Sequence, residues 1–198
     1  MCLVKNKFFN MILKRLLDIF SSFFLLVLLS PLIIIIAILI KCDSQGSVLF
    51  WSIRFGKNKC LFKMPKFRSM SSDAPIVDTK NFKDSYKFVT KIGKFLRITS
   101  LDEIPQLFSV IKGDMSLVGP RPALYTQDDL IDLRDKYQIN SFRPGITGFA
   151  QINGRDNLSL KKKVSLEVEY MKNHDICLDI KIILITIFGL KWLKDISH

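Results

Sequence analysis

The sequence has few of the residues that build zinc sites and disulfide frameworks. Its four cysteines are far apart and form no C-x-x-C pair: Cys2, Cys42, Cys60 and Cys177. Only His174 and His198 could complete a zinc site. We therefore expect the thiols to be reduced and structural. Repeats and low-complexity tracts are also missing.

Acidic residues are scarce: the sequence has 18 Asp and Glu and 30 Lys and Arg, which gives a net charge of +12. Such a surplus favours phosphates, anionic lipid headgroups or nucleic acid as partners, and charge alone does not choose among them. The acids include no Asp-x-Asp pair. That absence argues against the glycosyltransferases that bind their metal through this motif.

Charge is missing altogether from Ile19–Ile40, a run of 22 residues. As a helix this run would reach about 33 Å, which matches the ~30 Å hydrocarbon core of a bilayer. A cleavable signal peptide would have a shorter apolar region and a small-residue cleavage site, and neither is found here. The pattern predicts a retained membrane helix.

Ser30-Pro31 lies in the middle of this run, where the proline removes a helix hydrogen bond and predicts a bend. Both flanks are basic, so both are expected on the cytoplasmic side. A re-entrant helix that breaks at Ser30-Pro31 satisfies both observations, and a single span with a kink is the alternative. We divide the chain into a membrane-embedded helix, residues 1–41, and a catalytic domain, residues 42–198.

A second apolar run, Ile182–Leu190, is bracketed by lysines and followed by Trp192. Nine residues reach only about 14 Å as a helix, too short to span a bilayer. The run predicts an amphipathic helix in the membrane interface, with its lysines extended toward the headgroups. A buried core helix is the alternative.

Between the apolar runs, the pattern predicts a small mixed domain of the α+β class. Two stretches rich in aromatic and branched residues predict strands on either side of a turn at Gly56-Lys57-Asn58: Ser47–Phe55 and Cys60–Phe67. The polar stretch 71–91 is expected to be a loop with some helix. Helices are expected at three places: Leu101–Lys112, Thr126–Tyr137 and Leu158–Asn173.

Asp102 and Glu103 are adjacent carboxylates at the predicted start of one helix. Ser100 with Glu103 could be a simple capping box. Pro105 weakens this interpretation, because a helix capped by Ser100 would place the proline where its missing N–H costs a hydrogen bond. With a start nearer Asp102, the pair is suited to holding Mg²⁺ or to attacking phosphorus.

Basic residues beside proline and glycine surround this pair in the sequence. Rigid backbone and a guanidinium fork suit a phosphate-binding site. Lys66-Phe67-Arg68 alternates basic and aromatic side chains, which could contact a nucleotide or only alternate across a strand. The candidate phosphate-binding residues are Lys66, Arg68, Arg97, Arg121, Arg143 and Arg155.

Four motifs follow one another in the sequence: Lys66-Phe67-Arg68-Ser69-Met70, the Ser100–Phe108 stretch, Lys112–Pro122 and Arg143-Pro144-Gly145-Ile146-Thr147-Gly148. They resemble the motifs of the bacterial sugar transferases, small monotopic polyprenyl-phosphate phosphoglycosyl transferases. The resemblance covers about residues 14–194. Larger relatives carry additional N-terminal membrane helices, so the chain looks like the minimal catalytic form.

The resemblance implies roles for individual residues. Asp102 matches the nucleophile and magnesium ligand, and Glu103 matches its partner carboxylate. Arg155 matches a phosphate-binding arginine, Arg97 and Arg121 match active-site positions, and Ser30-Pro31 matches the break in the re-entrant helix. The cofactor implied is Mg²⁺.

The implied reaction moves a sugar 1-phosphate from a nucleotide sugar, with UDP expected, onto undecaprenyl phosphate at the cytoplasmic face of the bacterial inner membrane. A covalent phosphosugar on Asp102 is expected, and direct transfer with Asp102 holding only metal is the alternative. A basic membrane-tethered module that binds nucleic acid or anionic lipid is a further alternative, which would not need the carboxylate pair. We expect membrane lipid and no nucleic acid as partners. The sugar is left open.

Overall fold

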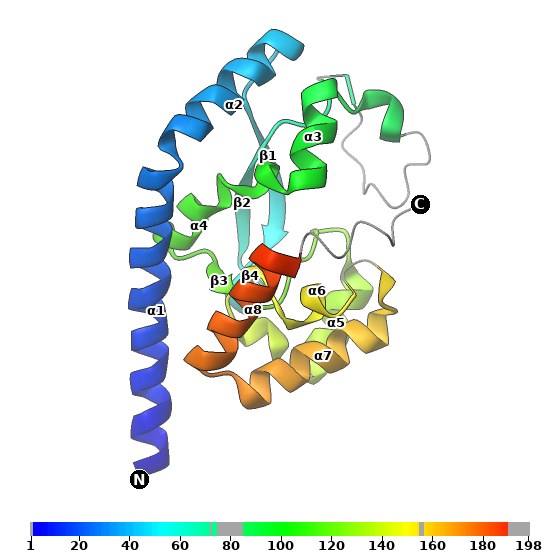
Figure 1. Cartoon of the computed structure of the whole chain (residues 1–198). Helices are drawn as coiled ribbons and strands as arrows, with labels where there is room; N and C mark the ends of the chain where they lie inside the picture. The colour runs from blue at the N-terminus through cyan, green and yellow to red at the C-terminus, as the bar shows by residue number, and fades with distance from the viewer. Residues whose placement is uncertain (1, 72, 75–84, 155–156, 190–198) are drawn as a thin grey trace.

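The computed structural model describes residues 2–71, 73–74, 85–154 and 157–189 (Figure 1). It begins with two helices, α1 (Cys2–Leu28) and α2 (Ser30–Asp43), whose axes bend by 61° at the break between them. Pro31 has no N–H to offer the carbonyl of Val27, one turn earlier. The Ser30 hydroxyl donates to that carbonyl instead, at 2.8 Å. The chain therefore bends at Leu29, directly before the predicted Ser30-Pro31 break.

The outer faces of these two helices are apolar and exposed. Among the described residues, no single helix is both long enough and apolar enough to cross a membrane, whereas α1 and α2 together meet that test as a bent pair. Large side chains exposed on the pair include Phe20, Phe23, Phe24, Ile34, Ile35 and Ile38.

An antiparallel hairpin forms the centre of the molecule (Figure 1). Strand β1 (Leu49–Phe55) pairs with β2 (Leu61–Phe67), and Leu49 lies opposite Phe67. The turn between them takes Asn58 and Lys59 through positive φ, a region that asparagine tolerates better than most residues. The predicted strand, turn and strand are confirmed, with slightly later starts.

The predicted helix Leu101–Lys112 is wrong at its beginning. A 3₁₀ turn covers Leu101–Glu103, and α4 runs only over Gln106–Lys112, with Pro105 as its N-cap residue. Ser100 has a positive φ of 56° and makes no side-chain cap, so the capping box does not form. The chain here ends one helix and starts another, and Pro105 takes the position where its missing N–H costs least.

A helix that the sequence did not predict, α3 (Lys91–Thr99), precedes this turn. Thr90 caps it by accepting a hydrogen bond from the N–H of Gly93 at 2.9 Å. Gly93 lets α3 lie directly on β2's continuation, because a Cβ there would come within 2.0 Å of the Ser69 carbonyl oxygen. The 71–91 stretch contains a 3₁₀ turn at Ser85–Phe88, and residues 75–84 lie outside the described part of the chain.

Two short parallel strands, β3 (Ser116–Val118) and β4 (Gly145–Thr147), were also not predicted. They bring the third and fourth motifs together. A Cβ at Gly145 would lie 2.1 Å from the backbone nitrogen of Gly119. The two motifs therefore meet backbone against backbone, and only glycine fits at this crossing.

The remaining helices are α5 (Asp128–Lys136), α6 (Phe149–Ile152), α7 (Leu160–Asn173) and α8 (Ile176–Gly189). Helices α5 and α7 confirm the two predicted helices, each a little shorter. Helix α8 starts well before the predicted Ile182, and Leu190 and Trp192 lie outside the described residues. Val118, Tyr170 and Ile182 form one buried cluster that joins β3, α7 and α8. The mixture of helices and small sheets confirms the α+β class.

Candidate active site

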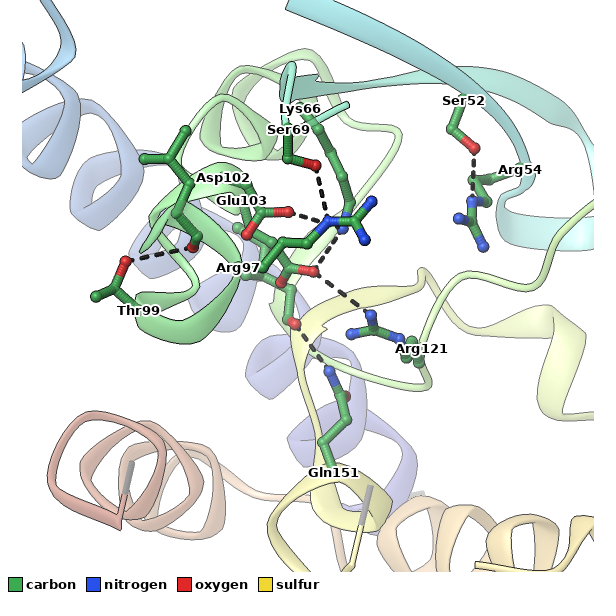
Figure 2. Close-up of polar contacts among 12 residues, drawn as sticks. Ser52, Arg54, Lys66, Ser69, Arg97, Thr99, Asp102, Glu103, Arg121 and Gln151 are labelled. Atoms are coloured by element: carbon green, nitrogen blue, oxygen red, sulfur yellow. Dashed lines mark hydrogen bonds and ion pairs between the residues drawn. The ribbon is translucent and has the colours of Figure 1, made fainter. Parts of the chain in front are cut away.

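A cavity of about 1200 Å³ lies between the β1–β2 hairpin, the α3–α4 connection and the loop after β3. Six of the predicted site residues line it, and five of them, from four separate stretches of sequence, form one cluster of charged side chains. Figure 2 shows these side chains pointing toward one another. They are Lys66, Arg97, Asp102, Glu103 and Arg121.

The carboxylate pair is positioned by the 3₁₀ turn that follows α3. Ser100 ends α3 in a left-handed conformation, and its carbonyl then accepts a hydrogen bond from the N–H of Glu103 at 3.2 Å. This turn presents both carboxylates to the cavity. Asp102 is only 8% exposed, so its charge is largely removed from water.

Lys66 on β2 links the two carboxylates. Its Nζ donates to Glu103 Oε1 at 2.7 Å and lies 3.6 Å from Asp102 Oδ2. Arg121 approaches the same Glu103 oxygen from the other side, with Nη2 at 3.4 Å. Figure 2 shows Glu103 between these two cations. The two carboxylates therefore lie beside cationic side chains.

Arg97 extends from the last turn of α3 into the same cavity. Its Nε donates to the Ser69 hydroxyl at 2.8 Å, which fixes the guanidinium against the first motif. Burial lowers the pKa of Arg97, and the charge of Asp102 opposes that shift. Arg97 thus remains a cation directed at the nucleophile candidate.

Burial is the largest influence on Asp102 and raises the pKa of its carboxyl group. Lys66 and Arg97 lower that pKa, and Glu103 raises it. The pKa of Asp102 thus depends on burial, which raises it, and on two cations, which lower it. A carboxylate poised in this way is typical of a functional site, because ordinary surface acids show neither the burial nor the converging charges.

Two other predicted phosphate-binding residues are engaged with backbone carbonyls. Arg68 is buried and donates to the carbonyls of Ser44 and Gln45, so it fastens the connection between α2 and β1, although it also lines the cavity. Arg143 donates from Nε to the Gly113 carbonyl at 2.9 Å and is not among the cavity-lining residues. Arg155 lies outside the described residues.

Some polar residues that line the cavity carry no charge and were not predicted. Gln151 on α6 donates from Nε2 to the Ile146 carbonyl at 2.9 Å, while its buried Oε1 has no hydrogen-bond partner among the described residues. Ser52 accepts from Arg54 Nε at 3.0 Å on β1. A charge pattern could not reveal Gln151, and its position next to the fourth motif was the only available signal.

The donors present suit Mg²⁺ better than zinc. Within the described ranges no group of three or more His, Cys, Asp or Glu side chains could hold a metal, as a structural zinc site would require. Mg²⁺ takes one or two carboxylates, keeps several waters and completes its shell with substrate phosphates. Asp102 and Glu103 supply two carboxylates at the cavity wall.

The chain is similar to known proteins over most of its length. The family described as bacterial sugar transferase matches residues 9–192. A UDP-glucose:undecaprenyl-phosphate glucose-1-phosphate transferase of Klebsiella pneumoniae is 44% identical over 90% of this chain and 40% of its own length. A UDP-N-acetylgalactosamine-undecaprenyl-phosphate N-acetylgalactosaminephosphotransferase of Aeromonas hydrophila is 37% identical over 88% of this chain and 43% of its own.

A third relative has about the same length as this chain. The exopolysaccharide production protein PSS of Rhizobium leguminosarum bv. phaseoli is 37% identical over 90% of this chain and 94% of its own length. By contrast, the chain spans only about two fifths of the Klebsiella and Aeromonas proteins.

Proposed function

The chain belongs to the bacterial sugar transferase family, and from that membership and the geometry of its cavity we propose that it is a phosphoglycosyl transferase. It moves a sugar 1-phosphate from a UDP-sugar to undecaprenyl phosphate, giving undecaprenyl-diphospho-sugar and UMP. This reaction is the first membrane step of a surface glycan or glycoprotein pathway. The names of the Klebsiella and Aeromonas relatives support both the donor and the acceptor.

The observation that carries the proposal is the pair formed by buried Asp102 and half-buried Glu103, which lies among Lys66, Arg97 and Arg121. A carboxylate that attacks a diphosphate must approach a group that is already anionic. Three cations at the same cavity reduce that repulsion and stabilise the charge that develops in the transition state. A module that only bound nucleic acid or anionic lipid would not need two carboxylates at the centre of its basic site.

In the first step an Asp102 carboxylate oxygen attacks the phosphorus that carries the sugar. The bond from this phosphorus to the bridging oxygen breaks, UMP leaves, and an acyl phosphate joins Asp102 to the sugar phosphate. Burial supports this role, because a desolvated carboxylate is a better nucleophile than a hydrated one. Arg97, fixed on Ser69, is suited to hold the transferred phosphoryl group.

In the second step an oxygen of the lipid phosphate attacks the same phosphorus, and the bond to Asp102 breaks. The lipid phosphate has a second pKa near 6 and is largely dianionic at neutral pH, so no strong general base is required. Glu103 is then suited to orient Lys66 and Arg121 rather than to move a proton. Asp102 and Glu103 would hold Mg²⁺, which would neutralise charge on the diphosphate.

We propose further that the α1–α2 pair is a re-entrant membrane helix, residues 1–41, and that residues 42–198 form the catalytic domain on the cytoplasmic face of the inner membrane. The bend at Leu29 and the exposed apolar faces of both helices support this topology. Helix α8 also exposes Leu184, Ile187 and Phe188, which suits a helix lying in the membrane interface.

A nucleotide-release screen tests the proposed reaction. The purified protein, with undecaprenyl phosphate and Mg²⁺, is offered UDP-glucose, UDP-galactose and their N-acetylated counterparts, and UMP is measured. We expect UMP from at least one donor, and none from the Asp102→Asn variant. The exposed residue Asp132 provides a matched control, since Asp132→Asn should leave the rate unchanged. Equal UMP release from wild type and Asp102→Asn would overturn the proposal.

A further inference from the structure

The loop that carries Arg121 is attached to the rest of the domain through its carbonyls. Pro120 and Pro122 have no N–H, so this stretch cannot be held by a normal strand ladder. Four consecutive carbonyls, those of residues 120–123, instead accept hydrogen bonds. Their donors are the N–H of Gly145 at 2.9 Å, Arg134 Nη2 at 3.0 Å, Arg54 Nη1 at 3.3 Å and the N–H of Phe55 at 3.0 Å.

Arg134 donates to the carbonyl of Arg121 itself, although Arg134 does not line the cavity. It lies on α5, is 3% exposed, and is absent from the cavity lining. Its Nε donates to Glu167 Oε2 at 2.8 Å, and its Nη2 also binds Glu167 Oε1. Glu167 on α7 is 2% exposed. One guanidinium therefore joins α5, α7 and the Arg121 loop.

Stability does not explain why this pair is buried. Removing two charges from water costs several kcal/mol per ion, and apolar residues of similar volume often replace such pairs without loss. A buried pair can instead fix one conformation. Here one guanidinium binds a carboxylate through Nε and Nη2 and a backbone carbonyl through Nη2.

The Arg121 side chain itself is weakly restrained. Its contact with Glu103 is 3.4 Å long, and the side chain is 39% exposed. Such a contact contributes little to holding a long side chain in place. The direction in which Arg121 extends is therefore set by its backbone, which Pro120 and Pro122 restrict and Arg134 fastens.

We propose that Arg134, held by Glu167, is a positioning residue for the transfer reaction: it fixes the backbone of Arg121 so that its guanidinium stays beside Glu103 in the cavity. The inference rests on the proposed function, because it gives Arg134 an effect on catalysis that passes entirely through Arg121. It follows that losing Arg134 and losing Arg121 should not be independent.

A double-mutant cycle tests this dependence. The Arg134→Met/Glu167→Leu variant replaces the ion pair with apolar groups, so its Tm should stay close to that of wild type. Its kcat/KM should fall by about tenfold or more, in the range found for residues that orient active-site groups. In the Arg121→Ala background the same replacement should cost almost nothing further. Lys59→Ala is the matched control. It breaks an exposed ion pair with Asp135, which lies on the same helix, α5, as Arg134.

Arg134→Lys gives a second test that does not depend on how the apolar pair packs. Lysine keeps the charge beside Glu167 but has no planar fork to reach the Arg121 carbonyl as well, so the same coupled loss is expected. Wild-type kcat/KM in the folded variants, or losses that multiply fully with Arg121→Ala, would overturn the inference. Absence of UMP release from wild type would overturn the proposed function itself, and the two failures are distinguished by the wild-type rate.

Discussion

Asp102 is a residue whose burial opposes the charge that its proposed role requires. Because its pKa is raised in the folded protein, the folded state binds the proton more tightly than the unfolded state does. The resulting stability is fully present below the unfolded pKa of about 3.9 and is lost as pH rises through the folded pKa. At neutral pH the ionised carboxylate therefore lowers the free energy of unfolding.

The first prediction follows from that sign. Asp102→Asn should raise the Tm at pH 7, by about 2–4 °C for each kcal/mol gained, because the amide is nearly isosteric and carries no charge to desolvate. The gain should shrink as pH falls toward about 4, the unfolded pKa of the carboxyl group. Thermal unfolding of both proteins across this pH range measures it, and an Asn variant less stable than wild type at neutral pH would contradict the account.

Lys66 leads to the second prediction, because its charge lowers the pKa of Asp102. Without that charge, Asp102 should need a higher pH to ionise. The acid limb of the kcat/KM profile of Lys66→Met should therefore move to higher pH, in addition to any drop in the maximum rate. A profile that falls in height without moving would show that Lys66 does not tune Asp102. Lys63→Met, on the exposed face of the same strand, is the control.

For individual residues, the sequence predicted which charged side chains belong to the site better than it predicted which groups each of them binds. Lys66, Arg97, Asp102, Glu103 and Arg121 do line one cavity, as the clustering of charge in rigid motifs suggested. Other arginines of the same appearance bind backbone carbonyls, because the side-chain partner depends on which strands and turns come close in space. Gln151 was missed since an uncharged amide gives no pattern of its own.

Among the elements, the break between α1 and α2 bears most on the proposed membrane topology. In the third prediction, Ser30 is replaced by alanine and Pro31 by leucine. Leucine has an N–H, so the missing helix hydrogen bond to the Val27 carbonyl can form. The helix should then straighten into a span and force the basic N-terminus outward or cause mis-insertion.

Thiol labelling reports this topology. With Cys2 as the only cysteine, an impermeant maleimide added to intact spheroplasts should not label the natural Ser30-Pro31 background, and should label it after permeabilisation. Labelling of intact spheroplasts in that background would exclude the re-entrant topology. In the Ser30→Ala/Pro31→Leu variant, labelling from outside is expected.

Elements with a strong local pattern were predictable, and those defined by distant partners were not. The hairpin and helices α5 and α7 have clear periodicity and turn signals. Strands β3 and β4 span only Ser116–Val118 and Gly145–Thr147, so they show no alternation that could be recognised, and each exists because the other pairs with it. Helix α3 was hidden by its glycine, which packs against Ser69 but lowers helix propensity.

For the whole molecule, helix α1 is bound to the rest of the chain by polar contacts. Asp18 of α1 accepts from the Ser116 hydroxyl at 2.7 Å and from the N–H of Leu117 at 3.2 Å, at the strand that leads to the Arg121 loop. Lys14 binds Asp179 of α8 at 2.5 Å, and Asp179 accepts from Tyr170 at 2.7 Å. These buried and partly buried polar contacts join α1 to β3 and α8.

The fourth prediction concerns this connection. Asp18→Ala should lower the free energy of unfolding of the solubilised protein by about 1–3 kcal/mol, because the buried Ser116 hydroxyl and the partly buried N–H of Leu117 lose an acceptor. Asp132→Ala, at an exposed position of α5, should change it little. Denaturant or thermal unfolding in the same detergent compares them, and equal stability of the two variants would show that α1 is not held by Asp18.

The central claim is that the sugar phosphate passes through Asp102, and a burst experiment without acceptor tests it most directly. Enzyme mixed with Mg²⁺ and its UDP-sugar, in the absence of undecaprenyl phosphate, should release about one equivalent of UMP rapidly and then stop, since the covalent adduct accumulates. Asp102→Asn should give no burst, and mass spectrometry should find the sugar phosphate on a peptide containing Asp102. Release of UMP only when undecaprenyl phosphate is present would contradict the account and favour direct transfer.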